Sequence, residues 1–82
     1  MYKVLIERGA EQDLDRIEPK MRNRVIAHLL MLKNNTRTNA KKLKGTDNVW
    51  RIRVGDFRII YEIEDKTKAI KIYRIKHRSK AY

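Results

Sequence analysis

The amino-acid sequence predicts an α+β fold in which two N-terminal helices pack on one face of a small, largely antiparallel four-stranded sheet, in the order β-α-α-β-β-β. Two observations predict it. Apolar residues recur with helical spacing in the first half of the chain, and they alternate with polar residues in the second half. The length of 82 residues predicts a single domain, residues 1–82. The sequence contains no cysteine, which excludes disulfides, thiolate metal sites and a cysteine nucleophile.

The first half begins with a short strand and a short helix. Tyr2–Ile6 is predicted to be the strand. Ala10, Leu14 and Ile17 recur at i, i+4 and i+7, which predicts a short helix with its charges on the outer face. Pro19 ends that helix, because proline cannot continue it.

A second helix is predicted from Lys20 to about Asn34, with Pro19 suited to its first turn. Its apolar side chains form one stripe that we expect to face the core, widened by two further positions. The stripe consists of Met21, Val25, Leu29 and Leu32, and the widening residues are Ile26 and Leu30.

The second half predicts a hairpin and a last strand. Val49–Val54 and Phe57–Ile63 alternate strictly and are separated by Gly55-Asp56, a two-residue turn signal. The last strand is predicted at Ala69–Ile75. The side chains expected to face the helices are those of Trp50, Ile52, Val54, Phe57, Ile59, Tyr61 and Ile63.

The opposite face of the hairpin carries Arg51, Arg53, Arg58 and Glu62. A two-residue turn sets Arg53 opposite Arg58. Like charges in this position are unfavourable, by about 0.2–1 kcal/mol, unless an anion lies between them. Arginine suits a phosphate because its planar guanidinium forms two parallel hydrogen bonds. The alternative is a solvated basic face, with some of the charge paired to Glu62.

The net charge of +11 supports a polyanionic partner. Residues 1–18 carry three basic and five acidic side chains, whereas residues 19–82 carry eighteen and five. The basic field therefore belongs to the second helix and the sheet, which favours nucleic acid or the ribosome. A membrane partner is not expected, because the basic residues are not confined to one amphipathic helix and no apolar run approaches the ~18 residues of a membrane span.

The residues favour metal-free RNA cleavage over other chemistries. The carboxylates and the two histidines show no metal-ligand spacing, no glycine-rich phosphate loop is present, and Ser79 lacks an evident triad carboxylate. In metal-free cleavage the ribose 2′-OH attacks the adjacent phosphate, so the protein must supply cations and proton transfer. We assign the cations to Arg53 and Arg58, proton transfer to His77, and base stacking to Tyr82. Alternatively, His77 only closes the last strand and Tyr82 is a terminus without a role.

Three stretches resemble the RelE/ParE toxin superfamily. They are Lys42-Leu43-Lys44-Gly45, the hairpin from Val49 to Tyr61, and the ending His77-Arg78-Ser79-Lys80-Ala81-Tyr82. The ending is similar to the RelE branch, whose members are ribosome-dependent mRNA endonucleases of type II toxin–antitoxin modules.

The resemblance implies a function, partners and a set of site residues. The chain would cut mRNA in the ribosomal A site, next to 16S rRNA, in the cytoplasm, without a metal or cofactor. A small RelB-like antitoxin would be its cognate partner. The catalytic residues would be Arg53, Arg58, His77 and Tyr82, and the RNA-binding residues Arg51, Lys44, Lys76 and Arg78. Some relatives have lysines where this chain has arginines on the second strand. Arginine is a poor proton acceptor, so the acid and base roles are left to His77 and Tyr82 in either order.

Two other functions stay open from the sequence. One is a ParE-like inhibitor of DNA gyrase, which shares the hairpin and has no use for the tail tyrosine. The other is a non-catalytic module that binds RNA or the ribosome.

Overall fold

The structure is a computed structural model that describes residues 2–34, 40–42 and 48–77. Within them the chain forms two helices and five strands. The helices are α1 (Arg8–Asp15) and α2 (Pro19–Met31), and the strands are β1 (Lys3–Ile6), β2 (Lys41–Lys42), β3 (Val49–Val54), β4 (Phe57–Glu64) and β5 (Ala69–His77). No helix in the described segments is long and apolar enough to cross a membrane.

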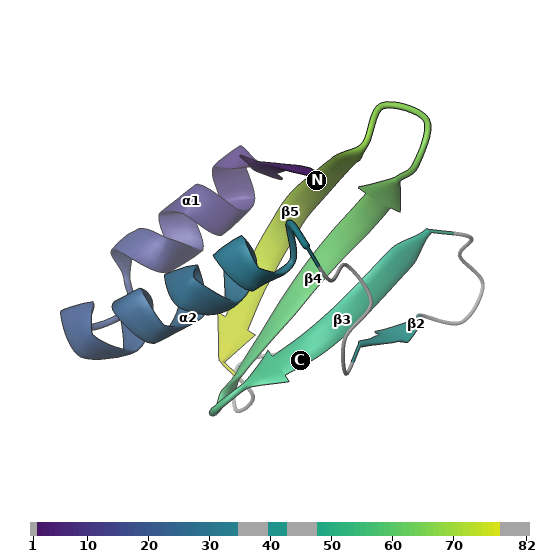
Figure 1. Cartoon of the computed structure of the whole chain (residues 1–82). Coiled ribbons are helices and arrows are strands. Elements are labelled where there is room, and N and C mark those ends of the chain that lie inside the picture. Colours follow the sequence, from purple (N-terminus) through teal and green to yellow (C-terminus); the bar gives the residue numbers. More distant parts are fainter. Residues whose placement is uncertain (1, 35–39, 43–47, 78–82) are drawn as a thin grey trace.

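The strands form one mixed sheet in the order β1-β5-β4-β3-β2 (Figure 1). β1 is parallel to β5, and the other neighbours are antiparallel. The predicted α+β class and the largely antiparallel sheet are confirmed. The predicted count of four strands is wrong, because Lys41 and Lys42 pair with Arg51 and Trp50 as a two-residue edge strand. Two adjacent lysines show no alternation, so no sequence signal marks this strand.

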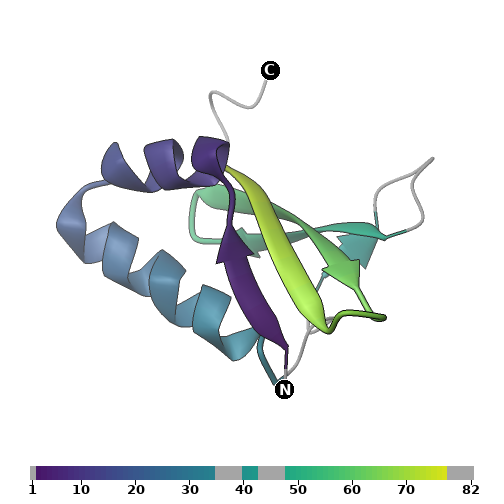
Figure 2. The same ribbon diagram turned by 90° about the horizontal axis from the view of Figure 1, so that it is seen from above.

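Both helices lie on one side of the sheet (Figure 2). They turn sharply at Pro19, and Arg22 on α2 donates hydrogen bonds to the carbonyls of Leu14 and Ile17, at 3.0 and 2.9 Å. Leu14 lies in the last turn of α1 and Ile17 follows the helix, so these bonds tie the start of α2 to the end of α1. The core between helices and sheet consists of Ala10, Leu14, Ile17, Val25, Leu29, Leu32, Ile52, Val54, Ile59, Tyr61, Ile63, Ile70, Ile72 and Ile75.

The second helix is shorter than expected, and its core-facing apolar stripe is narrower. It ends at Met31 instead of Asn34, and the prediction that Leu30 faces the core is wrong, since this side chain is 52% exposed. Leu29 is only 2% exposed. Consecutive residues differ by about 100° around a helix, so with Leu29 pointing at the sheet Leu30 turns towards solvent. Ile26 is partly buried and packs against the core, as predicted.

The hairpin has the predicted register. Val54 pairs with Phe57, Arg53 with Arg58 and Arg51 with Ile60. Gly55 has a φ of +59°, and Asp56 is not among the described residues with positive φ, which is the pattern of a type II′ turn. The last strand extends past the predicted end at Ile75 to His77.

Candidate functional site

The sheet face that points away from the helices carries a row of three cations, one from each of three neighbouring strands. Arg53 on β3 pairs with Arg58 on β4, and Arg58 pairs with Lys76 on β5. Their side chains share a face because each partners the next directly across the ladder. No described helix covers this face (Figure 2). We call it the open face.

A second basic pair adjoins the row. Lys41 on β2 lies opposite Arg51 on β3. Together with Arg53 and Arg58 they line a hollow of about 210 Å³. Lys41 was not expected from the sequence, although it stands directly before the stretch that begins at Lys42. Its contribution depends on the two-residue strand, which only the structure reveals.

A β-bulge decides which residues of β5 reach the open face. The register passes from Ile60 opposite Arg74 to Tyr61 opposite Ile72, so Tyr73 is an extra residue. Two residues therefore separate the buried Ile72 and Ile75, and the alternation after the bulge is reversed. As a result Lys76 joins the arginines on the open face, and His77 points to the helix side.

His77 does not share a face with the arginines. Its ring meets that of Phe57 edge to face, with centroids 5.2 Å apart and an angle of 85° between the planes. The two side chains lie at the end of the sheet next to a hollow of about 460 Å³. The other residues that line this hollow are Asp13, Arg16, Ile17, Arg74, Ile75 and Lys76. Lys76 thus borders both the open face and the hollow beside His77.

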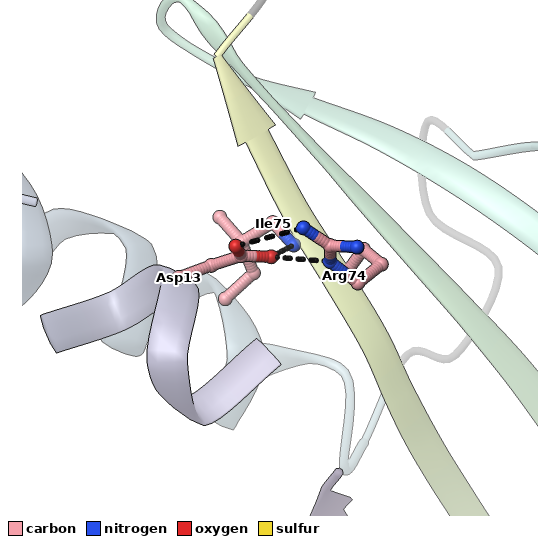
Figure 3. A network of polar contacts seen from close by, with 3 residues as sticks. All are labelled: Asp13, Arg74 and Ile75. Atoms are coloured by element: carbon pink, nitrogen blue, oxygen red, sulfur yellow. Dashed lines mark hydrogen bonds and ion pairs between the residues drawn. The ribbon is translucent and has the colours of Figure 1, made fainter. Parts of the chain in front are cut away.

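A carboxylate on α1 holds the end of β5 in place (Figure 3). β1 ends at Ile6, opposite Ile72, so no described strand flanks the following residues of β5 on that side. At this edge the side chain of Asp13 pairs with β5 in place of a strand. Its Oδ2 accepts hydrogen bonds from the Ile75 amide at 2.8 Å and from Arg74 Nε at 2.9 Å, and its Oδ1 accepts one from Arg74 Nη2 at 3.1 Å.

These partners keep the Asp13 carboxyl ionised. Burial alone would raise its pKa, but the hydrogen bonds from Arg74 and Ile75 and the nearby positive charges lower the pKa below 3.8. Gly9 lets α1 come this close, because a Cβ there would lie 2.9 Å from Arg74 Cδ and 3.2 Å from the Tyr73 carbonyl oxygen. The hydrogen bonds between Asp13 and β5 therefore fix Arg74 and Ile75, the two residues just before Lys76 and His77.

The far end of the open face is acidic. Glu62 accepts a hydrogen bond from the Tyr73 hydroxyl, and Glu64 forms an ion pair with Lys71 at 3.3 Å. The bond to Glu62 raises the pKa of Tyr73 to about 12. Glu62 was the expected alternative partner of the arginines. Within residues 2–34, 40–42 and 48–77, no ion pair joins it or another carboxylate to Arg51 or Arg53.

The structure thus brings together four of the predicted site residues, namely Arg51, Arg53, Arg58 and Lys76. His77 lies at the same end of the sheet on its other side. Lys44, Arg78 and Tyr82 lie outside the described residues. In the described part of the chain, no group of three His, Asp or Glu side chains is arranged to hold a metal ion.

Three comparisons relate this chain to known proteins. The family model for the ParE toxin of the type II toxin–antitoxin system, parDE, matches residues 4–82. Toxin RelE3 of Methanocaldococcus jannaschii is 33% identical over 85 residues, which cover 98% of this chain and 94% of the relative. The RelE–RelB complex from Pyrococcus horikoshii OT3 contains a chain with a TM-score of 0.85 and 29% identity, with 98% of each chain covered. The RelBE2 toxin–antitoxin complex from Mycobacterium tuberculosis gives a TM-score of 0.86 at 25% identity, over 94% of this chain and 98% of that chain.

Proposed function

The chain belongs to the RelE/ParE superfamily, the toxins of type II toxin–antitoxin systems, and on this basis we propose that it is a ribosome-dependent mRNA endoribonuclease that inhibits translation. It cuts in the A site, beside 16S rRNA, by attack of the ribose 2′-OH on the adjacent phosphate, and it needs no metal ion. The products are a 2′,3′-cyclic phosphate and a free 5′-OH. Such a protein acts in the cytoplasm, where the ribosomes are.

One observation carries the proposal: the row Arg53–Arg58–Lys76 on the open face. Three cations side by side repel one another, and a phosphate between them removes that cost. As the 2′-OH attacks, negative charge grows on the phosphate oxygens. Cations that are already in place stabilise this charge without reorganisation, and such stabilisation is usually the largest single contribution to catalysis.

Arg51 and Lys41 extend the binding surface along the RNA backbone. Lys44 and Arg78 are proposed to add further phosphate contacts, as the resemblance implies. These contacts carry no sequence information by themselves and position the strand.

Proton transfer is proposed for His77 and Tyr82, one as the base at the 2′-OH and the other as the acid at the 5′-oxygen. Histidine suits either role near neutral pH. Because His77 lies on the side of the sheet opposite to the arginine row, the RNA strand would have to pass around the end of β5 to reach it. Lys76 borders both sides of that end, and so it would hold the backbone where the strand turns.

The partner that would silence the toxin is a RelB-like antitoxin. The Pyrococcus horikoshii chain that the present chain resembles was solved in a RelE–RelB complex. In this chain the basic open face offers an acidic antitoxin segment a complementary surface.

A second candidate function is inhibition of DNA gyrase, because the matching family model is that of the ParE toxin. The two functions differ in what they damage. Induction of the chain in cells, followed by mapping of mRNA 5′ ends, separates them: new 5′ ends within codons support the endoribonuclease, whereas DNA damage with intact mRNA supports gyrase inhibition.

The direct test uses ribosomes programmed with a defined mRNA. We expect the purified protein to cut it and leave a 2′,3′-cyclic phosphate, and Arg58→Ala to reduce the rate on the order of 100-fold. Arg8→Ala is the matched control, since it removes an equal charge from an exposed position on α1. Equal rates for Arg58→Ala and the wild type would contradict the proposal.

A further inference from the structure

Tyr73 is the extra residue of the β5 bulge, and it lies on the open face. It stands opposite the step from Ile60 to Tyr61, between the buried Ile72 and the exposed Arg74. Its hydroxyl donates a hydrogen bond to Glu62 on β4. Since Glu62 alternates with the buried Tyr61 and Ile63, the bond fixes the Tyr73 ring on the side away from the core.

The position of this ring is unusual among the aromatic residues of the sheet. In the described strands Trp50, Phe57 and Tyr61 belong to the helix side and pack in or against the core. Tyr73 is half-buried on the opposite side. Its neighbours there are Ile60, which is also half-buried, and Glu62.

The ring lies at a border between charges of opposite sign. On one side, Arg58 is two residues from Ile60 along β4, a distance of about 7 Å, and Arg51 lies directly opposite Ile60. On the other side are Glu62, Glu7 and the ion pair of Glu64 with Lys71. A polyanionic strand is attracted to the basic half and repelled by the acidic end, so its path over the open face ends next to Tyr73.

A role for Tyr73 in proton transfer is disfavoured. Its hydroxyl proton is directed at Glu62, and the raised pKa of about 12 makes the phenol a weak acid near neutrality. What the side chain offers to a ligand is its ring, with the apolar Ile60 beside it. Unpaired bases stack on such rings, with little dependence on which base is present.

We propose that Tyr73, held by Glu62, is a stacking platform for an unpaired base of the RNA, next to the phosphate that lies on the Arg53–Arg58–Lys76 row. The proposal rests on RNA being the ligand of the open face, and it adds a contact to a base where the row contacts only phosphates. Glu62 acts as a positioning residue, because it fixes the ring and does not touch the RNA.

The test compares two RNA strands with the same phosphates. One is a short single-stranded adenine oligoribonucleotide, 2′-O-methylated so that it cannot be cut, and the other is the same backbone without bases. The wild type should bind the strand with bases more tightly by on the order of tenfold. Tyr73→Leu should remove most of this preference and leave the affinity for the abasic strand unchanged. Arg58→Ala should weaken both strands alike and lower the salt dependence of binding.

Tyr73→Phe separates the ring from the hydrogen bond, since it keeps the ring and releases Glu62. It should keep a preference for bases that lies between those of the wild type and Tyr73→Leu, because the ring remains but Glu62 no longer holds it. Equal behaviour of Tyr73→Phe and Tyr73→Leu, or an unchanged preference for bases in Tyr73→Leu, would overturn the stacking role. The readout is binding and not cleavage, so absence of mRNA cutting would count against the proposed function while leaving this comparison decisive.

Discussion

Arg53 lies directly opposite Arg58 in the β3–β4 ladder, and in the described part of the chain no carboxylate forms an ion pair with Arg53. Like charges directly opposite each other in an antiparallel ladder are unfavourable by about 0.2–1 kcal/mol. Natural proteins retain such arrangements where function requires them, at a cost in stability. The pair is therefore the clearest sign in the fold of a surface shaped by an anion.

Removing one member of this pair should have opposite effects on stability and on binding. We expect Arg53→Gln to raise the free energy of unfolding by about 0.2–1 kcal/mol, because the cross-strand repulsion is lost. The same change should weaken RNA binding. It should also reduce the magnitude of the slope of log affinity against log salt by about one, which corresponds to the loss of one phosphate contact. Urea unfolding and RNA binding at several salt concentrations measure the two effects. A variant that is less stable and binds RNA normally would show that Arg53 has a structural role instead.

The hairpin could be predicted in detail because a two-residue turn sets the register and alternation sets the faces. This placed Arg53 against Arg58 from the sequence alone, as the structure confirms. The end of β5 could not be predicted in the same way. In the sequence the bulge shows as a change in apolar spacing, from i, i+2 for Ile70 and Ile72 to i, i+3 for Ile72 and Ile75, and simple alternation does not account for it. The one extra residue, Tyr73, exchanges the faces of all that follow. For this reason Lys76 joins the arginines and His77 does not.

Lys76 and His77 should therefore respond differently to substitution. Lys76→Ala should weaken RNA binding and lower its salt dependence, because Lys76 belongs to the cation row. His77→Ala should leave the salt dependence unchanged. As the proposed proton-transfer residue, His77 should be needed for the reaction, so its loss should lower the cleavage rate. A cleavage rate in His77→Ala equal to that of the wild type would assign proton transfer to another residue.

The orientation of α2 can be checked with two adjacent leucines. Leu29 is 2% exposed and Leu30 is 52% exposed. Leu29→Ala should lower the free energy of unfolding by about 2–5 kcal/mol, because it leaves a cavity between the helix and the sheet. Leu30→Ala should change it by no more than about 0.5 kcal/mol, as is usual for surface positions. Urea denaturation of the two variants measures both values, and comparable losses would mean that the helix is rotated relative to the structure described.

The hydrogen bonds and ion pair between Asp13 and β5 should make the stability of the fold depend on pH in the acid range. The hydrogen bonds and positive charges around the carboxylate lower its pKa below the ordinary value of 3.8. A lowered pKa means that the folded state favours the ionised form, so the contribution is fully present above 3.8 and is lost as the pH falls through the folded-state value. We expect the difference in unfolding free energy between the wild type and Asp13→Asn to be constant from neutral pH down to mild acid. Below 3.8 it should shrink.

The control for this pH dependence is Glu11→Gln, which removes a carboxylate from an exposed position of the same helix. This variant measures the general effect of losing one carboxylate from α1, and the comparison separates that effect from the one specific to Asp13. Urea unfolding of the three proteins across the acid range measures both differences. If the difference for Asp13→Asn persists unchanged in strong acid, the substituted amide disturbs the packing of α1 on β5, and the charge of Asp13 does not stabilise the end of that strand.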